Sequence, residues 1–363
     1  MSAKLRPANP CALRDARAIT IVKRDNIGDF ILAKPFLDAA CAAWPEKEIT
    51  LICFPQVEPL ANLFYPRWKT RVIDDKNAYR GISFLPSKLK RELARWPVAD
   101  CLISLRAYRY PREITFDSWI PARAKIALRN QCYVRLLPDE LAYDEIIEST
   151  APVTPEISRE ILNHQALATH CFGTSVPLPS LPSFSSLSSL PPLPAAYIVV
   201  SPFGSAPIRD YPIPALAEAL KAIHAKHKLP LVITSVEKDT ARAETLRALC
   251  GSATQTISLA GKLTLPQFLA LIQKSAAVIS METATAHAAV ASGIPAVVFL
   301  GGGHYGLFAP WGDPAKVRWL HQRMDCYDCQ WNCRYDHARC IHEIPWQAAV
   351  DAFDAVFLNS SHS

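Results

Sequence analysis

The chain has 363 residues, of which 50% are apolar and 20% are charged, and its net charge is +6. This length is more than one ordinary hydrophobic core needs and suits two domains. The apolar runs are all shorter than the ~20 residues of a membrane-spanning helix. Charged side chains interrupt residues 1–18, so a secretory signal is not expected there. We therefore expect a cytoplasmic protein.

Positive charge is concentrated in the first part of the chain. Residues 1–130 contain 23 Lys and Arg against 13 Asp and Glu, whereas acidic residues are in excess in the remainder. A basic surface suits an anionic partner, such as a phosphorylated lipid surface or a phosphosugar, and a merely solvated surface is the alternative. No nucleic-acid-binding motif is present, and basic and aromatic residues are not interleaved, so nucleic acid is not expected as a partner.

Short apolar runs alternate with helical patterns in the first half of the chain. The runs that predict strands are 18–24, 48–54, 70–74 and 98–105. A helical pattern with one buried side follows the first of them. Continuous apolar strands separated by helices indicate a parallel sheet that is covered on both faces.

Residues 173–196 are rich in Pro and Ser and have no helical period, which predicts a semi-rigid linker. The alternation then begins again. Further strands are predicted over 196–202, 229–235, 276–281 and 295–301, and helices over 213–227, 237–249 and 283–293. Besides this linker, we expect an N-terminal domain over 1–172, a C-terminal domain over 197–345 that includes the cysteine cluster at 326–340, and a C-terminal helix and tail over 346–363. The fold class is α/β, with two Rossmann-like domains whose parallel sheets face a central cleft.

A polar segment, KRDNIGDF (23–30), lies where the first strand turns into the first helix. Ligands bind at this edge of an open α/β sheet. Asp29 stands at the start of the helix, where it either caps the helix or presents a carboxylate to a ligand. Arg24 and Asn26 in this segment, and Arg106 after the strand at 98–105, are candidates for contact with a ligand at this edge.

The segment SMETATAHAAVASGIP (280–295) repeats the order strand, turn, helix, strand in the second half. The helix start offers free backbone N–H groups beside the hydroxyls of Thr283 and Thr285, which suits a diphosphate. Glu282 precedes these groups. His287 lies one turn into the helix and adds a hydrogen-bond donor, with packing in the core as the alternative.

These motifs, in this order, resemble glycosyltransferase family 9. The KRDNIGD segment, followed by a helix that ends in Trp44–Pro45, looks like the opening of that family. Residues 280–295 are similar to its donor-binding Asp-Thr/Ser-Gly-x-x-His box. Glu282 replaces the Asp of that box and Ala284 replaces the Gly. The resemblance implies the GT-B arrangement of two Rossmann-like domains.

The resemblance also implies roles for single residues. Asp29 matches the carboxylate proposed in the family as the general base, which removes the proton from the acceptor hydroxyl in an inverting transfer. Arg209, shortly before a Tyr-Pro pair, matches a cation that neutralises charge on the leaving phosphate. Glu237, or Asp239 in an alternative register, lies where the family has a carboxylate thought to hold the donor ribose. The candidate donor-binding residues are Ser201, Arg209, Glu237, Glu282, Thr283, Thr285, His287, Gly302 and His304. The candidate acceptor-binding residues are Arg24, Asn26 and Arg106.

Gly302 and His304 belong to the segment GGGHYGLF (301–308), which offers a flexible loop at a strand end. As a phosphate-binding motif it is weak, because it lacks the Lys-Ser/Thr of a P-loop. Its predicted place at the end of a strand nevertheless makes it a candidate for contact with the donor.

Four of the 11 cysteines cluster near the C-terminus with the spacing C-x2-C-x3-C-x6-C: Cys326, Cys329, Cys333 and Cys340. Four thiols at such spacing can surround one tetrahedral Zn²⁺ or an iron ion, and a site with four cysteine ligands is structural. Reduced thiols in a compact loop are the alternative, and His337 or His342 could replace one thiol. The other cysteines are predicted to be small buried side chains.

We therefore expect an inverting, metal-independent transferase of a sugar, heptose from ADP-heptose by resemblance, onto a lipopolysaccharide core or a similar anionic glycolipid. Contact with the inner membrane would then be peripheral. Metal independence is expected because no convincing Asp-x-Asp box is present. Arg209 and the helix start would then stabilise the leaving diphosphate in place of a metal ion. Another nucleotide sugar is the nearest alternative. A non-catalytic nucleotide-sugar-binding protein with a structural metal site is a second, and a dinucleotide-dependent oxidoreductase is disfavoured because G-x-G-x-x-G is missing.

Overall fold

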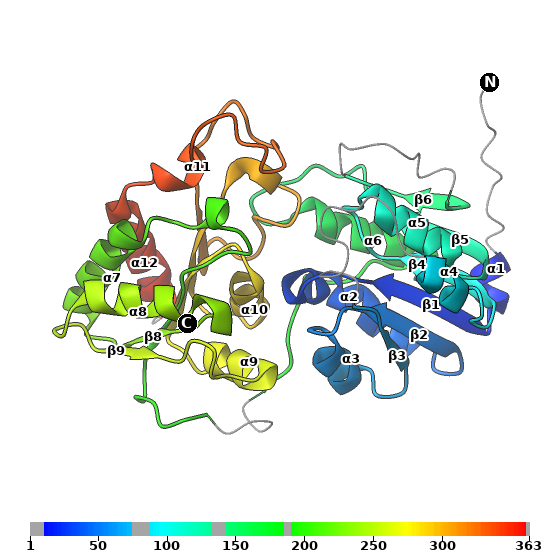
Figure 1. Cartoon of the computed structure of the whole chain (residues 1–363), viewed down its shortest axis with the longest axis horizontal. Helices are drawn as coiled ribbons and strands as arrows, with labels where there is room; N and C mark the ends of the chain where they lie inside the picture. The colour runs from blue at the N-terminus through cyan, green and yellow to red at the C-terminus, as the bar shows by residue number, and fades with distance from the viewer. Residues whose placement is uncertain (1–10, 75–86, 132–141, 185–189, 361–363) are drawn as a thin grey trace. The chain divides into compact units, whose positions relative to one another are not determined.

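The computed structural model describes most of the chain, namely residues 11–74, 87–131, 142–184 and 190–360. The chain divides into two compact units (Figure 1). Unit 1 consists of Met1–Pro152 and Arg159–Pro177, and unit 2 consists of Val153–Ser158 and Leu178–Ser363. Each unit is built around its own parallel sheet.

Unit 1 contains a six-stranded parallel sheet in the order β3-β2-β1-β4-β5-β6. Its strands are β1 (Ala18–Lys23), β2 (Glu48–Cys53), β3 (Lys69–Val72), β4 (Ala99–Ser104), β5 (Ala122–Leu128) and β6 (Glu145–Ile147). The chain runs outward from β1 to β3 and then returns to the other side of β1. The strand order therefore reverses between β1 and β4, and their carboxyl ends form the crevice in which open α/β sheets bind ligands.

Helices cover both faces of this sheet. They are α1 (Cys11–Asp15), α2 (Ile27–Ala43), α3 (Glu58–Phe64), α4 (Ser87–Leu93), α5 (Pro111–Trp119) and α6 (Arg159–Phe172). Helices α2 and α6 pack together, and α4 packs beside α5. The alternation of side chains along β1 separates the two faces, since Val22 joins the apolar cluster of α4 and α5 whereas Lys23 pairs with Glu160 of α6.

Unit 2 repeats this topology in the order β12-β11-β10-β7-β8-β9, again all parallel. Its strands are β7 (Ile198–Ser201), β8 (Leu231–Ile233), β9 (Thr256–Ser258), β10 (Ala277–Met281), β11 (Ala296–Phe299) and β12 (Val317–Leu320). Its α-helices are α7 (Ile213–His227), α8 (Thr240–Cys250), α9 (Leu265–Gln273), α10 (Ala284–Ala291), α11 (Arg339–His342) and α12 (Trp346–Ser360). Here the strand order reverses between β7 and β10.

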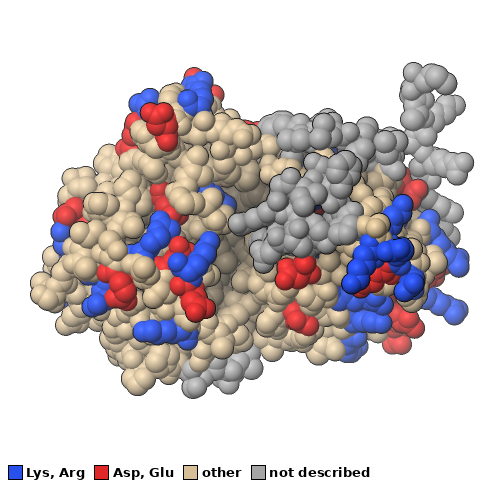
Figure 2. Space-filling model, viewed as in Figure 1, with Lys and Arg blue, Asp and Glu red and all other residues tan. Residues whose placement is uncertain are grey.

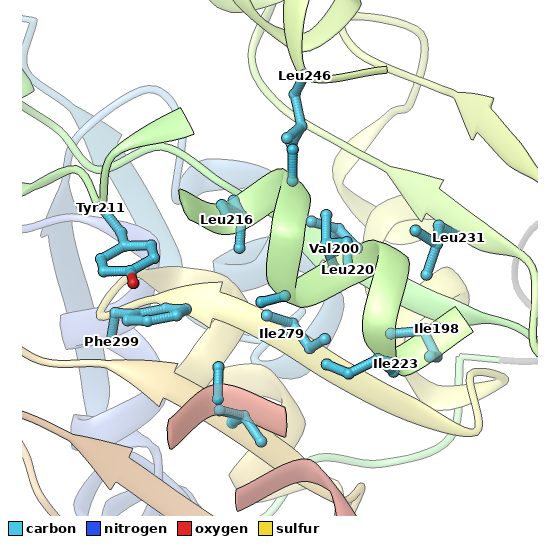
Figure 3. Packing of buried hydrophobic residues seen from close by; sticks show 14 of the residues in the cluster. Ile198, Val200, Tyr211, Leu216, Leu220, Ile223, Leu231, Leu246, Ile279 and Phe299 are labelled. Carbon is cyan, nitrogen blue, oxygen red and sulfur yellow. The ribbon is translucent and has the colours of Figure 1, made fainter. Parts of the chain in front are cut away.

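The core of unit 2 lies between the sheet and the layer of α7, α8 and α12. Figure 3 shows Leu216, Leu220 and other apolar residues of α7 packed above the strands. At one end of this layer, the ring of Tyr211 stacks on that of Phe299 with 4.1 Å between centroids. The Tyr211 hydroxyl donates to the Ile344 carbonyl oxygen at 2.6 Å, which ties the entry of α7 to the segment before α12.

The Pro/Ser-rich segment predicted as a linker is packed along unit 2 in its described part. The Leu181 N–H donates to the Ala291 carbonyl oxygen at 3.0 Å, and the Phe184 N–H donates to Gln273 Oε1 at 2.7 Å. The Phe184 side chain is fully buried. The boundary between the units, at residue 177, falls within this segment.

Among the described helices, none has the length and apolar character needed to cross a bilayer. Basic side chains gather over the α4 edge of unit 1 on the face shown in Figure 2. On α4 itself, Lys88, Lys90 and Arg91 are exposed.

Candidate functional site

The carboxyl ends of β7 and β10 bring together most of the predicted donor-binding residues. Ser201 ends β7, and Glu282 immediately follows β10. Between β7 and α7, the short 3-10 helix η2 (Pro207–Arg209) carries Arg209 to the same edge. Because the strand order reverses here, these residues line the crevice at which such sheets bind ligands.

Glu282 is the centre of a charged network at this edge. Its Oε2 accepts a hydrogen bond from Arg209 Nη2, and its backbone oxygen accepts another from the same nitrogen at 3.1 Å. His287 Nε2 lies 3.2 Å from Glu282 Oε1. On its other side, His287 Nδ1 accepts from Trp311 Nε1 at 2.9 Å. The side chain of Glu282 is 10% exposed and that of Arg209 is 20% exposed.

These contacts favour the charged form of Glu282 and select one tautomer of His287. Burial alone would raise the pKa of Glu282, but the Arg209 guanidinium and the His287 ring together hold that pKa below its usual range. The indole N–H of Trp311 can only donate, so Nδ1 of His287 carries no proton and Nε2–H donates to the Glu282 carboxylate. The ring is buried, as the packing alternative expected, and both ring nitrogens are engaged by Glu282 and Trp311, while contact of His287 with the donor stays a prediction.

The start of α10 uses its hydroxyl groups internally. Thr283 is the N-cap, and its Oγ1 accepts from the Thr285 N–H at 3.3 Å. Thr285 Oγ1 donates to Ser201 Oγ at 2.9 Å, which ties α10 to the end of β7. Thr283 and the preceding Glu282 are half-buried, whereas Thr285 is buried. The Thr285 hydroxyl therefore holds the crevice together rather than standing free beside the helix start.

The glycine segment after β11 is packed more tightly than the sequence predicts. It forms η4 (Gly302–His304), and Gly301, Gly302 and Gly303 are buried. A Cβ atom on Gly302 would lie 2.3 Å from Cδ1 of Tyr327, and one on Gly301 would lie 2.3 Å from Cη2 of Trp331. The expectation of a flexible loop is therefore wrong: these positions are glycine because two aromatic rings lie directly against the backbone.

The residues around the four cysteines form a loop that covers this glycine segment. The backbone N–H groups of Asp328 and Gln330 donate to the carbonyl oxygens of Gly302 and Gly303 at 2.8 and 2.9 Å. The Gly302 N–H donates to Cys340 Sγ at 3.3 Å. Both backbone polar groups of Gly302 are thus engaged within unit 2. We call residues 326–340 the cysteine loop.

The four cysteines of this loop line one small cavity together with glycine and aromatic residues. All four are free thiols and half-buried. Burial and the neighbouring thiols raise the pKa of Cys340 and of Cys329. As the side chains stand, no three Cys, His, Asp or Glu residues in the described part of the chain are arranged to hold a metal ion. The four cysteines share one cavity lining, and the coordination predicted from their spacing stays a prediction.

Two other predicted donor residues lie beside this network. His304 accepts at Nδ1 from Trp331 Nε1 at 3.3 Å, and burial with the nearby Arg209 charge lowers its pKa to about 4. Glu237 begins η3 (Glu237–Asp239) after β8, where its side chain is exposed. The alternative register, Asp239, is buried and pairs with Arg242 at 3.2 Å.

In unit 1, the predicted base lies in the first turn of α2. Asp29 Oδ2 accepts from the backbone N–H of Asn26, the exposed N-cap residue, at 3.1 Å. Asp29 therefore does cap the helix, as one of the two interpretations of the sequence proposed. The side chain is half-buried, so the capping bond also fixes the carboxylate at the carboxyl end of β1.

A buried charged cluster lies beside Asp29 that the sequence did not reveal. Lys23 is fully buried, and its Nζ lies 2.9 Å from Glu160 Oε1 and 3.1 Å from Asp25 Oδ2. Arg106 lies with Nε 2.8 Å from Asp25 Oδ1. Burial would lower the pKa of Arg106, but the carboxylates of Asp25 and Glu113 raise it above its ordinary value. In the sequence, only a Lys and an Asp at the end of an apolar strand point to this cluster. The partner carboxylate of Glu160 could not be predicted, because it is 137 residues from Lys23 along the chain.

The other predicted acceptor residue, Arg24, is part of the core of unit 1. It is 3% exposed, and its guanidinium carbon lies 3.6 Å from the ring centroid of Phe116 and 5.3 Å from that of Phe54. Arg106 is more accessible, with 17% of its side chain exposed. Of the predicted acceptor residues, Arg106 and Asn26 therefore present the more accessible side chains at the edge of unit 1.

One family model matches part of the chain. The model of glycosyltransferase family 9 (heptosyltransferase) matches residues 173–338. This range contains the network of Arg209, Glu282 and His287 and most of the cysteine loop. It confirms the resemblance drawn from the sequence and the prediction of a glycosyltransferase. No curated protein matches the chain.

Solved structures of low sequence identity share the fold over nearly the whole chain. A family 9 glycosyltransferase from Veillonella parvula has a TM-score of 0.68 at 16% identity and covers 94% of this chain and 97% of its own. The Escherichia coli ADP-heptose lipopolysaccharide heptosyltransferase II gives 0.65 at 15% identity, with 95% and 99% covered. The dodecameric iron-containing E. coli heptosyltransferase TibC, solved with ADP-D-β-D-heptose, gives 0.55 at 12% identity, with 95% and 77% covered. These likenesses confirm the predicted GT-B class with two parallel α/β sheets.

Proposed function

We propose, from the match of residues 173–338 to the model of glycosyltransferase family 9, that the chain transfers heptose from ADP-heptose to a lipopolysaccharide core or a similar anionic glycolipid, with inversion. The observation that carries the proposal is the network at the β7/β10 switch point, which lies within the matched range. The donor is supported by the names of two proteins of the same fold, which contain ADP-heptose.

In this proposal unit 2 binds the donor. Arg209 has a delocalised charge that suits two phosphate groups, and Glu282 and Ser205 hold its guanidinium in place. The N-terminus of α10 adds the positive end of a helix dipole. When the bond between the anomeric carbon and the diphosphate breaks, negative charge develops on the leaving oxygen. Arg209 and the helix start stabilise that charge, so we propose a transfer that needs no metal.

Unit 1 supplies the base. The acceptor hydroxyl oxygen forms its bond to the anomeric carbon from the side opposite the diphosphate, and its proton passes to a carboxylate oxygen of Asp29. Oδ2 of Asp29 is held by the Asn26 N–H at 3.1 Å, so the carboxylate keeps one orientation. The products are the glycosylated acceptor and ADP.

We propose that the acceptor is recruited from an anionic surface by α4. Lys88, Lys90 and Arg91 are exposed on this helix, and Arg95 is exposed just after it. Each basic residue near an anionic lipid surface contributes ~1 kcal/mol. Changing Lys88, Lys90 and Arg91 to Glu should abolish co-sedimentation with vesicles of anionic phospholipid. The same change at Lys221, Lys226 and Arg247 of unit 2 should not.

We also propose that the cysteine loop binds one structural Zn²⁺ or iron ion. The support is the presence of four soft sulfur ligands in the lining of one cavity and the iron named for TibC. When bound, the ion would cross-link the loop. The purified protein should contain about one metal ion per chain by elemental analysis. Cys329→Ser should lose it, Cys171→Ser should retain it, and metal-free wild type would contradict the proposal.

The experiment that tests the donor assignment is calorimetric binding of ADP-heptose beside UDP-, GDP- and CMP-sugars. Wild type should bind ADP-heptose selectively, and Arg209→Ala should weaken that binding. Arg247→Ala is the matched control, since Arg247 is an exposed cation in unit 2 paired with Glu244. Binding of a different nucleotide sugar would change the donor, and no binding at all would remove the proposal.

A further experiment separates an enzyme from a non-catalytic binding protein. Wild type mixed with ADP-heptose and deep-rough lipopolysaccharide should release ADP and extend the acceptor by one heptose, measured by mass spectrometry. Donor binding without any transfer to this acceptor or to simpler glycolipids would favour a binding protein.

A further inference from the structure

Trp331 of the cysteine loop touches two of the groups assigned to the donor. Its ring centroid lies 5.1 Å from the guanidinium carbon of Arg209. Its indole N–H donates to His304 Nδ1 at 3.3 Å, and the two rings meet nearly edge to face, with centroids 6.1 Å apart. We propose that Trp331 is a positioning residue that holds Arg209 and His304 for the diphosphate of the donor. The proposal rests on the function proposed above.

The indole cannot move independently of the glycine segment. A Cβ on Gly301 would lie 2.3 Å from one ring carbon, and a Cβ on Gly303 would lie 2.5 Å from another. The ring therefore packs directly against both residues. The adjacent Gln330 N–H is bonded to the Gly303 carbonyl oxygen at 2.9 Å, which fixes the loop in the same register.

The backbone of Trp331 is itself held in an unfavourable conformation. Its φ is 65°, in the left-handed region that bulky residues rarely occupy. Asp328 and Gln330 also have positive φ, at 68° and 51°. Such conformations persist when surrounding contacts determine them, and they concentrate at functional sites. Here the contacts that hold the loop are the ones that place the indole against Arg209.

The indole restricts a side chain that is otherwise long and adaptable. Glu282 and Ser205 engage the terminal nitrogens of Arg209, and the face of Trp331 bounds the guanidinium from another side. A guanidinium on an indole face is attracted by the ring as well as confined by it. Confinement before binding reduces the entropy lost when the diphosphate arrives. Since Trp331 lies between Cys329 and Cys333, the conformation of the cysteine loop is transmitted directly to the donor site.

The test compares ADP with adenosine as calorimetric probes on full-length protein. Arg209 and His304 act on phosphate groups, so Trp331→Leu should weaken ADP binding about 10-fold and leave adenosine binding unchanged. Trp331→Phe keeps an aromatic face but cannot donate to His304, and should weaken ADP binding about 3-fold. Trp346→Leu, which removes a half-buried indole at the start of α12, is the matched control and should leave both affinities unchanged.

A double-mutant cycle shows whether Trp331 acts through Arg209. In an Arg209→Ala background, Trp331→Leu should weaken ADP binding less than 3-fold, because the group that it positions is absent. If Trp331→Leu fails to fold, the Phe variant carries the same comparison.

Three outcomes would overturn the inference. Unchanged ADP affinity in both Trp331 variants would show that the indole positions nothing. Equal losses for ADP and adenosine would show general structural damage. If wild type binds no ADP, the proposed function fails and this inference fails with it, whereas ADP binding that ignores Trp331 leaves the proposed function standing.

Discussion

Asp29 Oδ2 accepts a hydrogen bond from the backbone N–H of Asn26 at 3.1 Å, so one carboxylate both caps α2 and stands at the carboxyl end of β1. A carboxamide can accept the same bond. Asp29→Asn should therefore fold with a loss of unfolding free energy below ~1 kcal/mol. It should lower kcat about 10²- to 10⁴-fold, because the amide cannot take the acceptor proton.

The check on Asp29 combines steady-state transfer rates with donor calorimetry. Donor affinity should be nearly unchanged, because the donor is assigned to unit 2. Asp38→Asn is a control on the same helix, since Asp38 pairs with Lys34 rather than capping the first turn. A fully active Asp29→Asn enzyme would remove the base assignment and leave only the capping role.

The strands at the centre of each sheet could be predicted because they are continuous apolar runs. β1 and β10 carry buried residues on both faces, and both were expected within one or two residues of their observed bounds. β6, β9 and β12 are short edge strands with half-exposed side chains, so no apolar run marks them. β5 was not predicted, because the exposed Arg123 and the half-buried Lys125 interrupt its apolar residues.

The candidate site could be predicted only where its residues follow a strand directly. Glu282 was identified in this way and Arg209 by the family resemblance, but the direct contact between them joins residues 73 positions apart. The burial of Gly302 was not predictable, because it depends on the Tyr327 ring that packs against it from the cysteine loop. Hydrophobic periodicity describes which face of an element is buried and carries no information on such long-range polar and aromatic contacts.

Glu282 holds Arg209 and His287 together, so neutralising it should cost stability as well as function. Glu282→Gln keeps the shape but replaces a charge-assisted bond to Arg209 with a neutral one. We expect a loss of ~1–3 kcal/mol in the free energy of unfolding, measured by urea denaturation. Glu244→Gln breaks the exposed pair with Arg247 and should change stability by less than ~0.5 kcal/mol. If both substitutions lowered the free energy of unfolding by the same amount, the Glu282 network would stabilise the fold no more than an exposed ion pair does.

His164 should make unit 1 sensitive to acid. Burial and the neighbouring Lys23 charge lower the pKa of His164 to about 3, below its ordinary value near 6.5. Between these values the unfolded chain binds a proton that the folded chain does not. The free energy of unfolding should therefore fall as pH decreases below about 6.5, by up to ~1.4 kcal/mol per pH unit from this residue.

Urea unfolding between pH 7 and pH 4.5 measures this effect. His164→Gln retains a donor for the Leu105 carbonyl oxygen, which lies 3.3 Å from Nε2, and should show a shallower loss of stability with acid. Glu160, whose pKa burial raises, is present in both proteins, so its effect largely cancels in the comparison. Identical pH dependence of the two proteins would mean that His164 is protonated in the fold.

Gly302 tests the contact between the glycine segment and the cysteine loop. A Cβ at this position would lie 2.3 Å from Cδ1 of Tyr327, too close for any real contact, so Gly302→Ala must displace the ring or the loop. Overpacking of this kind costs ~1–3 kcal/mol of unfolding free energy. Because Trp331 belongs to the same loop, ADP binding should weaken as well.

A second substitution distinguishes overpacking from a backbone effect. Tyr327→Ala removes the ring that the new methyl group would strike. In that background Gly302→Ala should cost much less, so the two changes together should destabilise the protein by less than the sum of their separate effects. Strict additivity in urea denaturation would place the cost of Gly302→Ala in the backbone itself. The observed φ of Gly302 is not in the left-handed region, so we expect the non-additive result.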